Sequence, residues 1–193
     1  MLKVVAVAGS RNREGKTARA INAICKGIHD AKGESEVIFL PELNLERCRQ
    51  CDLDGQGPCT REGYCVIKDD FPTIAKKVRA ADVFVCATPV YFGDLTESLR
   101  AFLDRFRRTV FLPPQAAPRD PDLLVKGKPA VGLCYAGGGG GFTITCAASL
   151  ERVLQICGFD IVDLILVRRQ NLEIKLPMLE LTGRWLVSRP TSH

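Results

Sequence analysis

Four cysteines lie close together in one stretch of the chain, at Cys48, Cys51, Cys59 and Cys65. Four thiolates in one such segment are enough to ligate an iron-sulfur cubane or a tetrahedral zinc ion. The neighbouring acids Asp52 and Asp54 disfavour gathering thiolates without a metal to neutralise them. A bound cluster, a bound zinc ion, a local disulfide and a metal-free loop are all open interpretations of this segment.

A second segment carries groups that favour an anion. Residues 9–17 read Gly-Ser-Arg-Asn-Arg-Glu-Gly-Lys-Thr, and a helical pattern begins directly after them. A helix N-terminus with hydroxyls and a lysine beside it stabilises a phosphate. A Walker A loop has one residue fewer between its glycines, and no later strand pattern ends in a Walker B acid. The dinucleotide pattern Gly-x-Gly-x-x-Gly is also missing, so a nucleotide hydrolase is the weaker interpretation.

Two further loops are suited to a flat ligand. Residues 87–94 read Ala-Thr-Pro-Val-Tyr-Phe-Gly-Asp, in which Tyr91 and Phe92 offer flat apolar surface and Gly93 permits close backbone approach. Residues 137–141 are consecutive glycines, whose unhindered N–H groups could wrap a ligand. An ordinary flexible loop is the alternative for the glycine run.

The sequence names no catalytic side chain. Its histidines are His29 and His193, which makes a His-based hydrolase or a multi-histidine metal site untenable. Asp69 and Asp70 stand at the start of a helical pattern, where we interpret them as helix caps, and Asp104 as the partner of a nearby arginine.

Strand and helix patterns show how the loops are brought together. Apolar runs predict strands that are buried on both faces, as in a parallel sheet, at Leu2–Ala8, Val37–Leu40, Val83–Ala87, Ala130–Tyr135 and Ile161–Val167. Amphipathic patterns predict helices over Thr17–Ala31, Phe71–Ala80, Leu95–Arg108 and Thr143–Ile156. This alternation predicts a doubly wound α/β fold, in which ligands bind beyond the carboxyl ends of the strands. We therefore expect the three loops to meet at one edge of the sheet.

Composition limits the domain count and the partners. With 193 residues, 46% hydrophobic, and no linker-like stretch, we expect one domain over residues 1–193, with a cysteine-rich insertion at 46–70 and a tail at 168–193. The net charge of +5 comes from interleaved acids and bases, so we expect no nucleic-acid partner. No apolar run approaches the roughly 20 residues of a membrane span, and the N-terminal run is too short for a signal peptide, so we expect a cytoplasmic address and no membrane partner.

Several charged and sulfur side chains have an ordinary structural interpretation. Arg105, Arg107 and Arg108 are interpreted as a solvated helix face. The five cysteines outside the cluster are interpreted as small buried hydrophobes, namely Cys25, Cys86, Cys134, Cys146 and Cys157.

Three segments resemble the NADPH-dependent FMN reductases and the iron-sulfur flavoproteins. GSRNREGKTA, from Gly9, resembles their GSPRxxGNTA-like phosphate loop, and TPVYFGDLTESLRAFLDR, from Thr88, resembles their TPVYF…LK…DR segment. CVIKDDF, from Cys65, resembles their C-x-I-x-D-D-M/F element. The resemblance covers most of residues 1–165. It implies a flavodoxin-like doubly wound five-stranded parallel sheet of order 2-1-3-4-5, with α/β/α layers and FMN as the cofactor.

The resemblance also assigns FMN contacts by position. Ser10, Asn12, Lys16 and Thr17 match phosphate contacts, residues 89–93 match ring contacts, and residues 137–139 match a third loop. Lys16 stands where the family usually has a small polar residue, and it would add a cation beside the phosphate. The expected cofactor-binding residues are Ser10, Arg11, Asn12, Gly15, Lys16, Thr17, Pro89, Val90, Tyr91, Phe92, Gly93, Gly137, Gly138 and Gly139.

The cysteine spacing departs from the family pattern. The cysteine spacing of the iron-sulfur flavoproteins is C-x2-C-x2-C followed by a fourth cysteine, whereas the spacing in this chain is C-x2-C-x7-C-x5-C. Related reductases keep some of these cysteines without a cluster, so metal-bound and metal-free loops stay open. Of the metals, a 4Fe–4S cluster is favoured over zinc because a cluster beside a flavin could pass single electrons.

We therefore predict an FMN-binding oxidoreductase that takes electrons from NAD(P)H and passes them to a small-molecule or protein acceptor. The alternatives are an electron-transfer carrier with FMN and a cysteine-ligated cluster, and a non-redox phosphate-binding protein. The resemblance further implies a homodimer or homotetramer. The preference between NADH and NADPH and the identity of the acceptor are not specified by the sequence.

Overall fold

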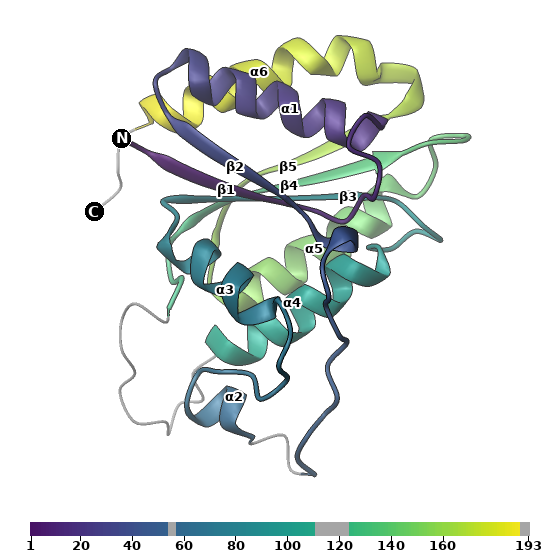
Figure 1. Ribbon diagram of the computed structural model, residues 1–193. Coiled ribbons are helices and arrows are strands. Elements are labelled where there is room, and N and C mark those ends of the chain that lie inside the picture. Colours follow the sequence, from purple (N-terminus) through teal and green to yellow (C-terminus); the bar gives the residue numbers. More distant parts are fainter. Residues whose placement is uncertain (54–56, 111–123, 190–193) are drawn as a thin grey trace.

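The computed structural model describes residues 1–53, 57–110 and 124–189, and its centre is a parallel β-sheet (Figure 1). The strands lie side by side in the order β2-β1-β3-β4-β5. Their bounds are β1 (Lys3–Ala8), β2 (Glu34–Phe39), β3 (Val83–Pro89), β4 (Pro129–Ala136) and β5 (Asp160–Arg168). All neighbouring pairs are parallel, so the flavodoxin-like strand order predicted from the sequence is confirmed.

Helices cover both faces of the sheet and complete the expected three layers (Figure 1). One face carries α1 (Lys16–Asp30) and α6 (Leu172–Ser188), and the other carries α3 (Phe71–Ala80), α4 (Glu97–Val110) and α5 (Thr143–Cys157). Short elements are α2 (Pro58–Arg61) in the cysteine-rich insertion and the single turns η1 (Leu40–Glu42) and η3 (Arg169–Asn171). In the residues that the structure describes, no helix has both the length and the apolar character needed to cross a membrane.

Burial follows the position of each strand in the sheet. Every residue of β3 and β4 is buried, as the apolar runs predict. The prediction is wrong for the edge strands, because β2 buries Phe39 alone and β5 buries only Ile165 and Val167. An edge strand has a neighbour on one side only, and its outer residues stay within reach of water.

Two hydrophobic clusters fill the space between the sheet and its helices. The cluster under α3, α4 and α5 contains Cys86, Cys134, Cys146 and Cys157, and the cluster under α1 and α6 contains Cys25. All five are buried free thiols, which confirms that they act as small apolar side chains. Burial raises the pKa of the Cys86 thiol well above its usual value, so this group stays protonated and unreactive.

The C-terminal segment packs against the first helix. The structure places α6, in the tail at 168–193, alongside α1 (Figure 1). A side-chain carbon on Gly27 would overlap the carbonyl oxygen of Glu180, and one on Gly183 would overlap that of Ile24. The two helix backbones are therefore in direct contact at these glycines. At the side of this contact, Lys26 Nζ lies 2.6 Å from the Glu180 carboxylate.

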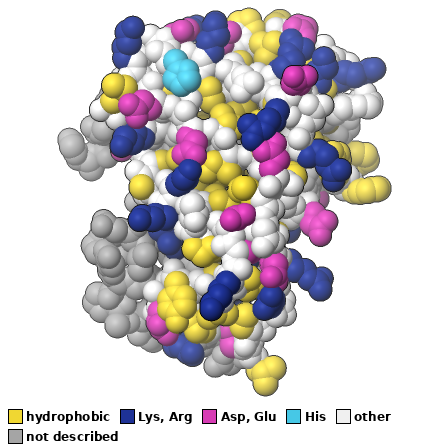
Figure 2. All heavy atoms as spheres, in the orientation of Figure 1, with side chains coloured by type: hydrophobic (Ala, Val, Ile, Leu, Met, Phe, Trp, Pro, Cys, Tyr) yellow, Lys and Arg dark blue, Asp and Glu magenta, His cyan; other side chains and the backbone are white. Residues whose placement is uncertain are grey.

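Figure 2 shows the surface in the same orientation. Positive and negative side chains are interspersed on this face, and neither sign gathers into a continuous field. The interleaving of acids and bases along the sequence is thus carried into the fold.

Candidate functional site

The loop after β1 joins the strand to an uncapped helix N-terminus. Gly9 N–H donates to the Ala87 carbonyl at 2.9 Å, which ties the loop to the neighbouring strand. The side-chain oxygen of Asn12 accepts a hydrogen bond from the N–H of Glu14, and the backbone carbonyl of Asn12 accepts one from the N–H of Gly15. Gly15 is the N-cap of α1, no side chain caps the helix, and its first turn contains no acid. The free N–H groups and the helix dipole are thus available to an anion.

The loop after β3 is a tight turn that projects its aromatic residues. Tyr91 and Asp94 exchange backbone hydrogen bonds at 3.1 and 3.0 Å. Phe92 and Gly93 in the turn have positive φ angles of 51° and 77°, and the Phe92 side chain is fully exposed. The Asp94 carboxylate accepts two bonds from Arg100 at 2.6 and 2.8 Å, which anchors the turn on α4.

The glycine run after β4 is an ordered turn with open backbone. Gly140 N–H donates to the Gly137 carbonyl at 2.7 Å, and the side chain of Gln170 donates to Gly139 at 2.9 Å. A side-chain carbon at Gly139 or Gly141 would meet no atom within 4 Å. The hydroxyl of Thr145 donates to the Gly93 carbonyl at 3.0 Å and so links this loop to the previous one.

The three loops line one open cleft of ≈ 460 Å³ at the carboxyl edge of the sheet. Eleven of the fourteen residues expected to bind a cofactor line it: Ser10, Lys16, Thr17, Pro89, Val90, Tyr91, Phe92, Gly93, Gly137, Gly138 and Gly139. The loop after β1 contributes hydroxyls and Lys16, and the loops after β3 and β4 contribute the aromatic side chains. The cleft is therefore polar and cationic where a phosphate would lie and apolar where a ring would lie.

Three expected residues lie elsewhere. Asn12 and Gly15 shape the loop through the hydrogen bonds described above, and Arg11 lines a neighbouring groove. The cleft also includes residues that the sequence did not single out, namely Tyr135, Ala136, Gly140, Gly141 and Phe142. Phe142, which is 73% exposed at a positive φ of 62°, was detectable as an aromatic residue directly after a glycine run.

The four clustered cysteines face one small cavity. Cys48, Cys51, Cys59 and Cys65 all line a space of ≈ 20 Å³ in the insertion between β2 and α3. They are free thiols, and in the ranges that the structure describes no three ligating side chains stand close enough to hold a metal ion. A preformed zinc site, with sulfurs about 2.3 Å from one centre, is therefore not seen there.

Two arginines complete the wall of this cavity. The Nε of Arg108 lies 3.4 Å from the sulfur of Cys59, and its guanidinium lies 3.5 Å from the Asp52 carboxylate. The pKa of Arg108 is raised, first by the hydrogen bond to Cys59 and then by the charges of Cys59, Cys48 and Asp52. Burial opposes the charge of Arg105, but hydrogen bonds to Asp69 and then to Cys65 outweigh it and raise its pKa. Two guanidinium groups thus lie beside the four thiols.

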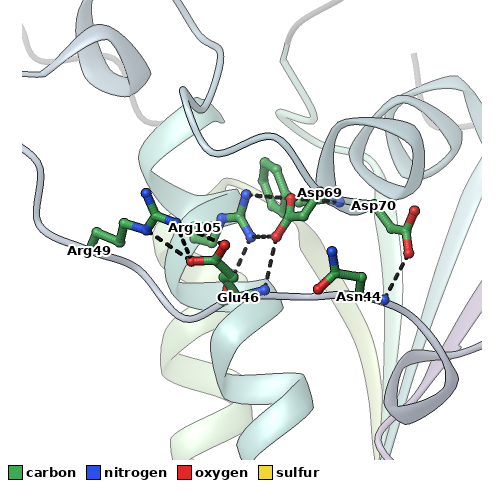
Figure 3. A network of polar contacts seen from close by, with 7 residues as sticks. Asn44, Glu46, Arg49, Asp69, Asp70 and Arg105 are labelled. Atoms are coloured by element: carbon green, nitrogen blue, oxygen red, sulfur yellow. Dashed lines mark hydrogen bonds and ion pairs between the residues drawn. The ribbon is translucent and has the colours of Figure 1, made fainter.

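Arg105 corrects the expectation of a solvated helix face. Its side chain is 1% exposed and that of its partner Asp69 is 0% exposed, with two hydrogen bonds between them at 2.6 and 2.9 Å (Figure 3). Arg108 is also largely covered, whereas Arg107 is 40% exposed and lies 3.6 Å from Asp104, as expected. The buried face of α4 can hold the Arg105 guanidinium because the Asp69 carboxylate pairs with it there.

Arg105 and Asp69 also lie at the neck of the cysteine-rich insertion, where residues 44–46 leave the main body and residues 69–71 return to it. Asp69 accepts from the backbone N–H groups of Glu46 and Phe71, and Asp70 accepts from that of Asn44 (Figure 3). The N-cap of α3 is Asp70, but its side chain makes no cap hydrogen bond and instead binds the backbone at Asn44, so the expectation that it caps the helix is wrong. Asp69, one residue earlier, accepts from the N–H of Phe71, the first residue of α3. Burial opposes ionisation of Asp69, but its bonds to Arg105 and the two N–H groups outweigh it and lower its pKa.

Comparison with known proteins agrees with this geometry. The sequence model of the NADPH-dependent FMN reductase family matches residues 2–164. An iron-sulfur flavoprotein of Methanocaldococcus jannaschii is 34% identical over 106 residues, which are 55% of this chain and 52% of the relative. The chain thus spans about half the length of the curated relatives that it matches at this level.

Solved structures share the fold. An NAD(P)H:quinone oxidoreductase from Methanothermobacter marburgensis matches with a TM-score of 0.69 at 18% identity, over 100% of this chain and 99% of that one. A flavodoxin from the domain Archaea matches with a TM-score of 0.60 at 12% identity, over 97% and 98% of the two chains. The fold is flavodoxin-like, and by the family match over most of its length the chain belongs to the NADPH-dependent FMN reductase family.

Proposed function

We propose that this protein is an FMN-dependent oxidoreductase that takes electrons from NAD(P)H and delivers them to a small-molecule or protein acceptor. The observation that carries the proposal is the cleft at the carboxyl ends of β1, β3 and β4, where three loops provide a phosphate end and a ring end. When bound, FMN supplies hydride and electron transfer. The role of the chain is to hold and orient it.

The residues of the cleft fit FMN in charge and shape. Lys16 and the uncapped N-terminus of α1 attract the phosphate, and the hydroxyls of Ser10 and Thr17 offer hydrogen bonds to it. Tyr91, Phe92 and Phe142 surround the other end with exposed apolar surface that a flat ring would cover. Among the described lining residues none is acidic, so nothing there repels a phosphate.

Replacing the phosphate-end hydroxyls separates phosphate binding from ring binding. We expect Ser10→Ala and Thr17→Ala each to weaken FMN binding by about 0.5–2 kcal/mol, the usual value of a hydrogen bond, in equilibrium dialysis of flavin-stripped protein. Riboflavin has no phosphate, so its affinity should change little. Thr182→Ala, on the outer helix α6, is the matched control. Equal losses for both flavins would mean loop collapse, and a protein that takes up no FMN or prefers ATP would contradict the proposal.

The electron donor is tested by the flavin absorption of the loaded protein. Rapid bleaching by NADPH supports the reductase. Bleaching only through a ferredoxin-like donor would instead favour an electron-transfer carrier.

A second function, electron transfer through a cysteine-bound 4Fe–4S cluster, is favoured by the cavity that the four thiols share. Cys48, Cys51, Cys59 and Cys65 supply the four thiolates that such a cluster takes, and Arg105 and Arg108 offset their negative charge. A cubane has several metal centres, so its thiolates need not converge on one point as zinc ligands do. The donor set fits the cluster in number and charge, and the cavity of ≈ 20 Å³ would have to widen to admit it.

Loss of one ligand should remove the whole cluster. In anaerobically purified protein we expect Cys59→Ser to abolish iron and acid-labile sulfide together, because an incomplete thiolate shell rarely retains a cubane. Cys157→Ser, in the hydrophobic core, is the control and should keep both. Near-stoichiometric zinc without iron in the wild type would replace the cluster by a structural metal. Neither metal, with FMN still bound, would make the segment an active-site loop.

A further inference from the structure

A second hollow adjoins the proposed flavin cleft. This groove, of ≈ 670 Å³, lies between the loop after β1, the segment after β2 and the first turn of α4. Tyr91 lines both the groove and the cleft, so the two hollows adjoin at that side chain. Pro41, Leu43 and Leu45 give the groove an apolar wall. A flat molecule that reached the flavin ring from this side would lie against that wall.

The groove contains two arginines without acidic partners. Arg11 and Arg47 line it, and neither forms an ion pair within the described ranges. Their neighbours in sequence behave differently, since Arg13 pairs with Glu42, and Arg49 pairs with Glu46 at 2.6 Å. Glu97 is the one acid among the described lining residues, so the charged side chains of the groove sum to a positive value.

A buried hydroxyl in the groove has no partner. Thr96 is 5% exposed and precedes the first residue of α4, and its Oγ1 has no hydrogen-bond partner among the residues that the structure describes. Its backbone is fixed by an N–H bond to Thr88 Oγ1 at 3.1 Å. The hydroxyl lies where a side-chain carbon on Gly9 would be, so glycine there leaves it room. A buried unsatisfied hydroxyl is costly, and next to the free N–H groups of a helix start it is suited to an anion.

We propose that this groove binds the anionic group of the substrate that exchanges electrons at the flavin cleft, through Arg11, Arg47 and the Thr96 hydroxyl. The ligand is a phosphate, sulfonate or carboxylate on a flat apolar body. The proposal rests on the proposed function, and it assigns Arg11 to the substrate instead of to the FMN phosphate. The apolar wall matches the flat body of such a ligand, the two guanidinium groups match its anion, and the shared Tyr91 places it beside the flavin cleft.

Direct binding tests the groove without turnover. Isothermal titration of FMN-loaded protein should show that a naphthoquinone sulfonate binds more tightly than neutral menadione. Arg11→Gln and Arg47→Gln should each weaken sulfonate binding about tenfold, the scale of a lost bond to a charged group, and leave menadione binding nearly unchanged. Arg13→Gln, whose side chain already pairs with Glu42, is the matched control and should behave as wild type.

Thr96→Val distinguishes a binding role from a structural one. Replacing a buried, unpartnered hydroxyl by a methyl group of similar size should leave the melting temperature unchanged or raise it. If Thr96 serves the anion, sulfonate binding should nevertheless weaken several-fold. Unchanged sulfonate binding would overturn its role. Loss of FMN affinity in the Thr96 or Arg11 variants would overturn the proposal, because the groove would then belong to the flavin site.

Two steady-state kinetic measurements identify whether the electron donor or the acceptor supplies the anion. With menadione as acceptor, a higher KM for NADPH in Arg11→Gln assigns the groove to the phosphates of the donor. With NADPH saturating, a higher KM for the sulfonate but not for menadione assigns it to the acceptor. No change in either arm overturns the proposal. Titration of flavin-free protein separates the two failures, because sulfonate binding without any FMN uptake contradicts the proposed function but not the groove.

Discussion

Arg105→Met is expected to lower the free energy of unfolding by about 3–5 kcal/mol, measured by urea denaturation at neutral pH. The substitution keeps the length and apolar stem of the side chain but leaves the Asp69 carboxylate buried without its charged partner. Arg107→Met on the same helix is the control. Its ion pair with Asp104 is half exposed, so we expect a change within about 1 kcal/mol. Equal losses in the two variants would refute a special role for the buried pair.

The pH dependence follows from the lowered pKa of Asp69 in the folded protein. A carboxyl with a depressed folded pKa contributes stability above its unfolded pKa of about 3.9, and the contribution is lost as the pH falls through the folded value. In Arg105→Met the unpaired buried carboxyl favours its neutral form, so acid relieves the variant. The stability gap between wild type and variant should therefore be largest at neutral pH and narrow on acidification.

Gly27→Ala is expected to destabilise the protein by about 1–3 kcal/mol, although alanine favours helix more than glycine does. The added methyl group would overlap the carbonyl oxygen of Glu180, which forces α6 away from α1. Gly141→Ala is the control, because a carbon there meets no atom within 4 Å. Thermal unfolding measures both. Gly183→Ala disturbs the same helix contact, so the double variant should lose less than the sum of the single losses.

Long buried runs made the sheet predictable. Strands β3 and β4 are almost entirely apolar because helices cover both faces of the sheet. Between helical patterns, a short apolar run of this kind predicts a central strand of a parallel sheet. The edge strand β5 has a similar sequence, and its half-exposed position is decided by the absence of a sixth neighbour in the described sheet. Local pattern does not contain that information.

Charge burial and the last helix were not predictable in the same way. Arg105 looks solvated in its helical pattern because its partner Asp69 lies 36 residues earlier. Helix α6 contains Pro177 and Gly183, which ordinarily weaken helices, and only contact with α1 explains the glycine. For the cleft, loop chemistry and strand order together were sufficient to predict that most of the named loop residues gather around one hollow. Arg11 lines a different hollow from Ser10, because adjacent residues in a loop can face different sides.

The closed neck of the cysteine-rich insertion has a consequence for how this fold changes over evolution. The carboxylates of Asp69 and Asp70 accept hydrogen bonds from the backbone N–H groups of Glu46 and Asn44, which joins the two ends of the segment where it leaves and re-enters the main body. The entropic cost of a loop with fixed ends grows only slowly with its length, by about 0.6 kcal/mol per doubling. With its two ends held in this way, a change in the length or the cysteine spacing of this segment should cost the sheet and the cleft little stability.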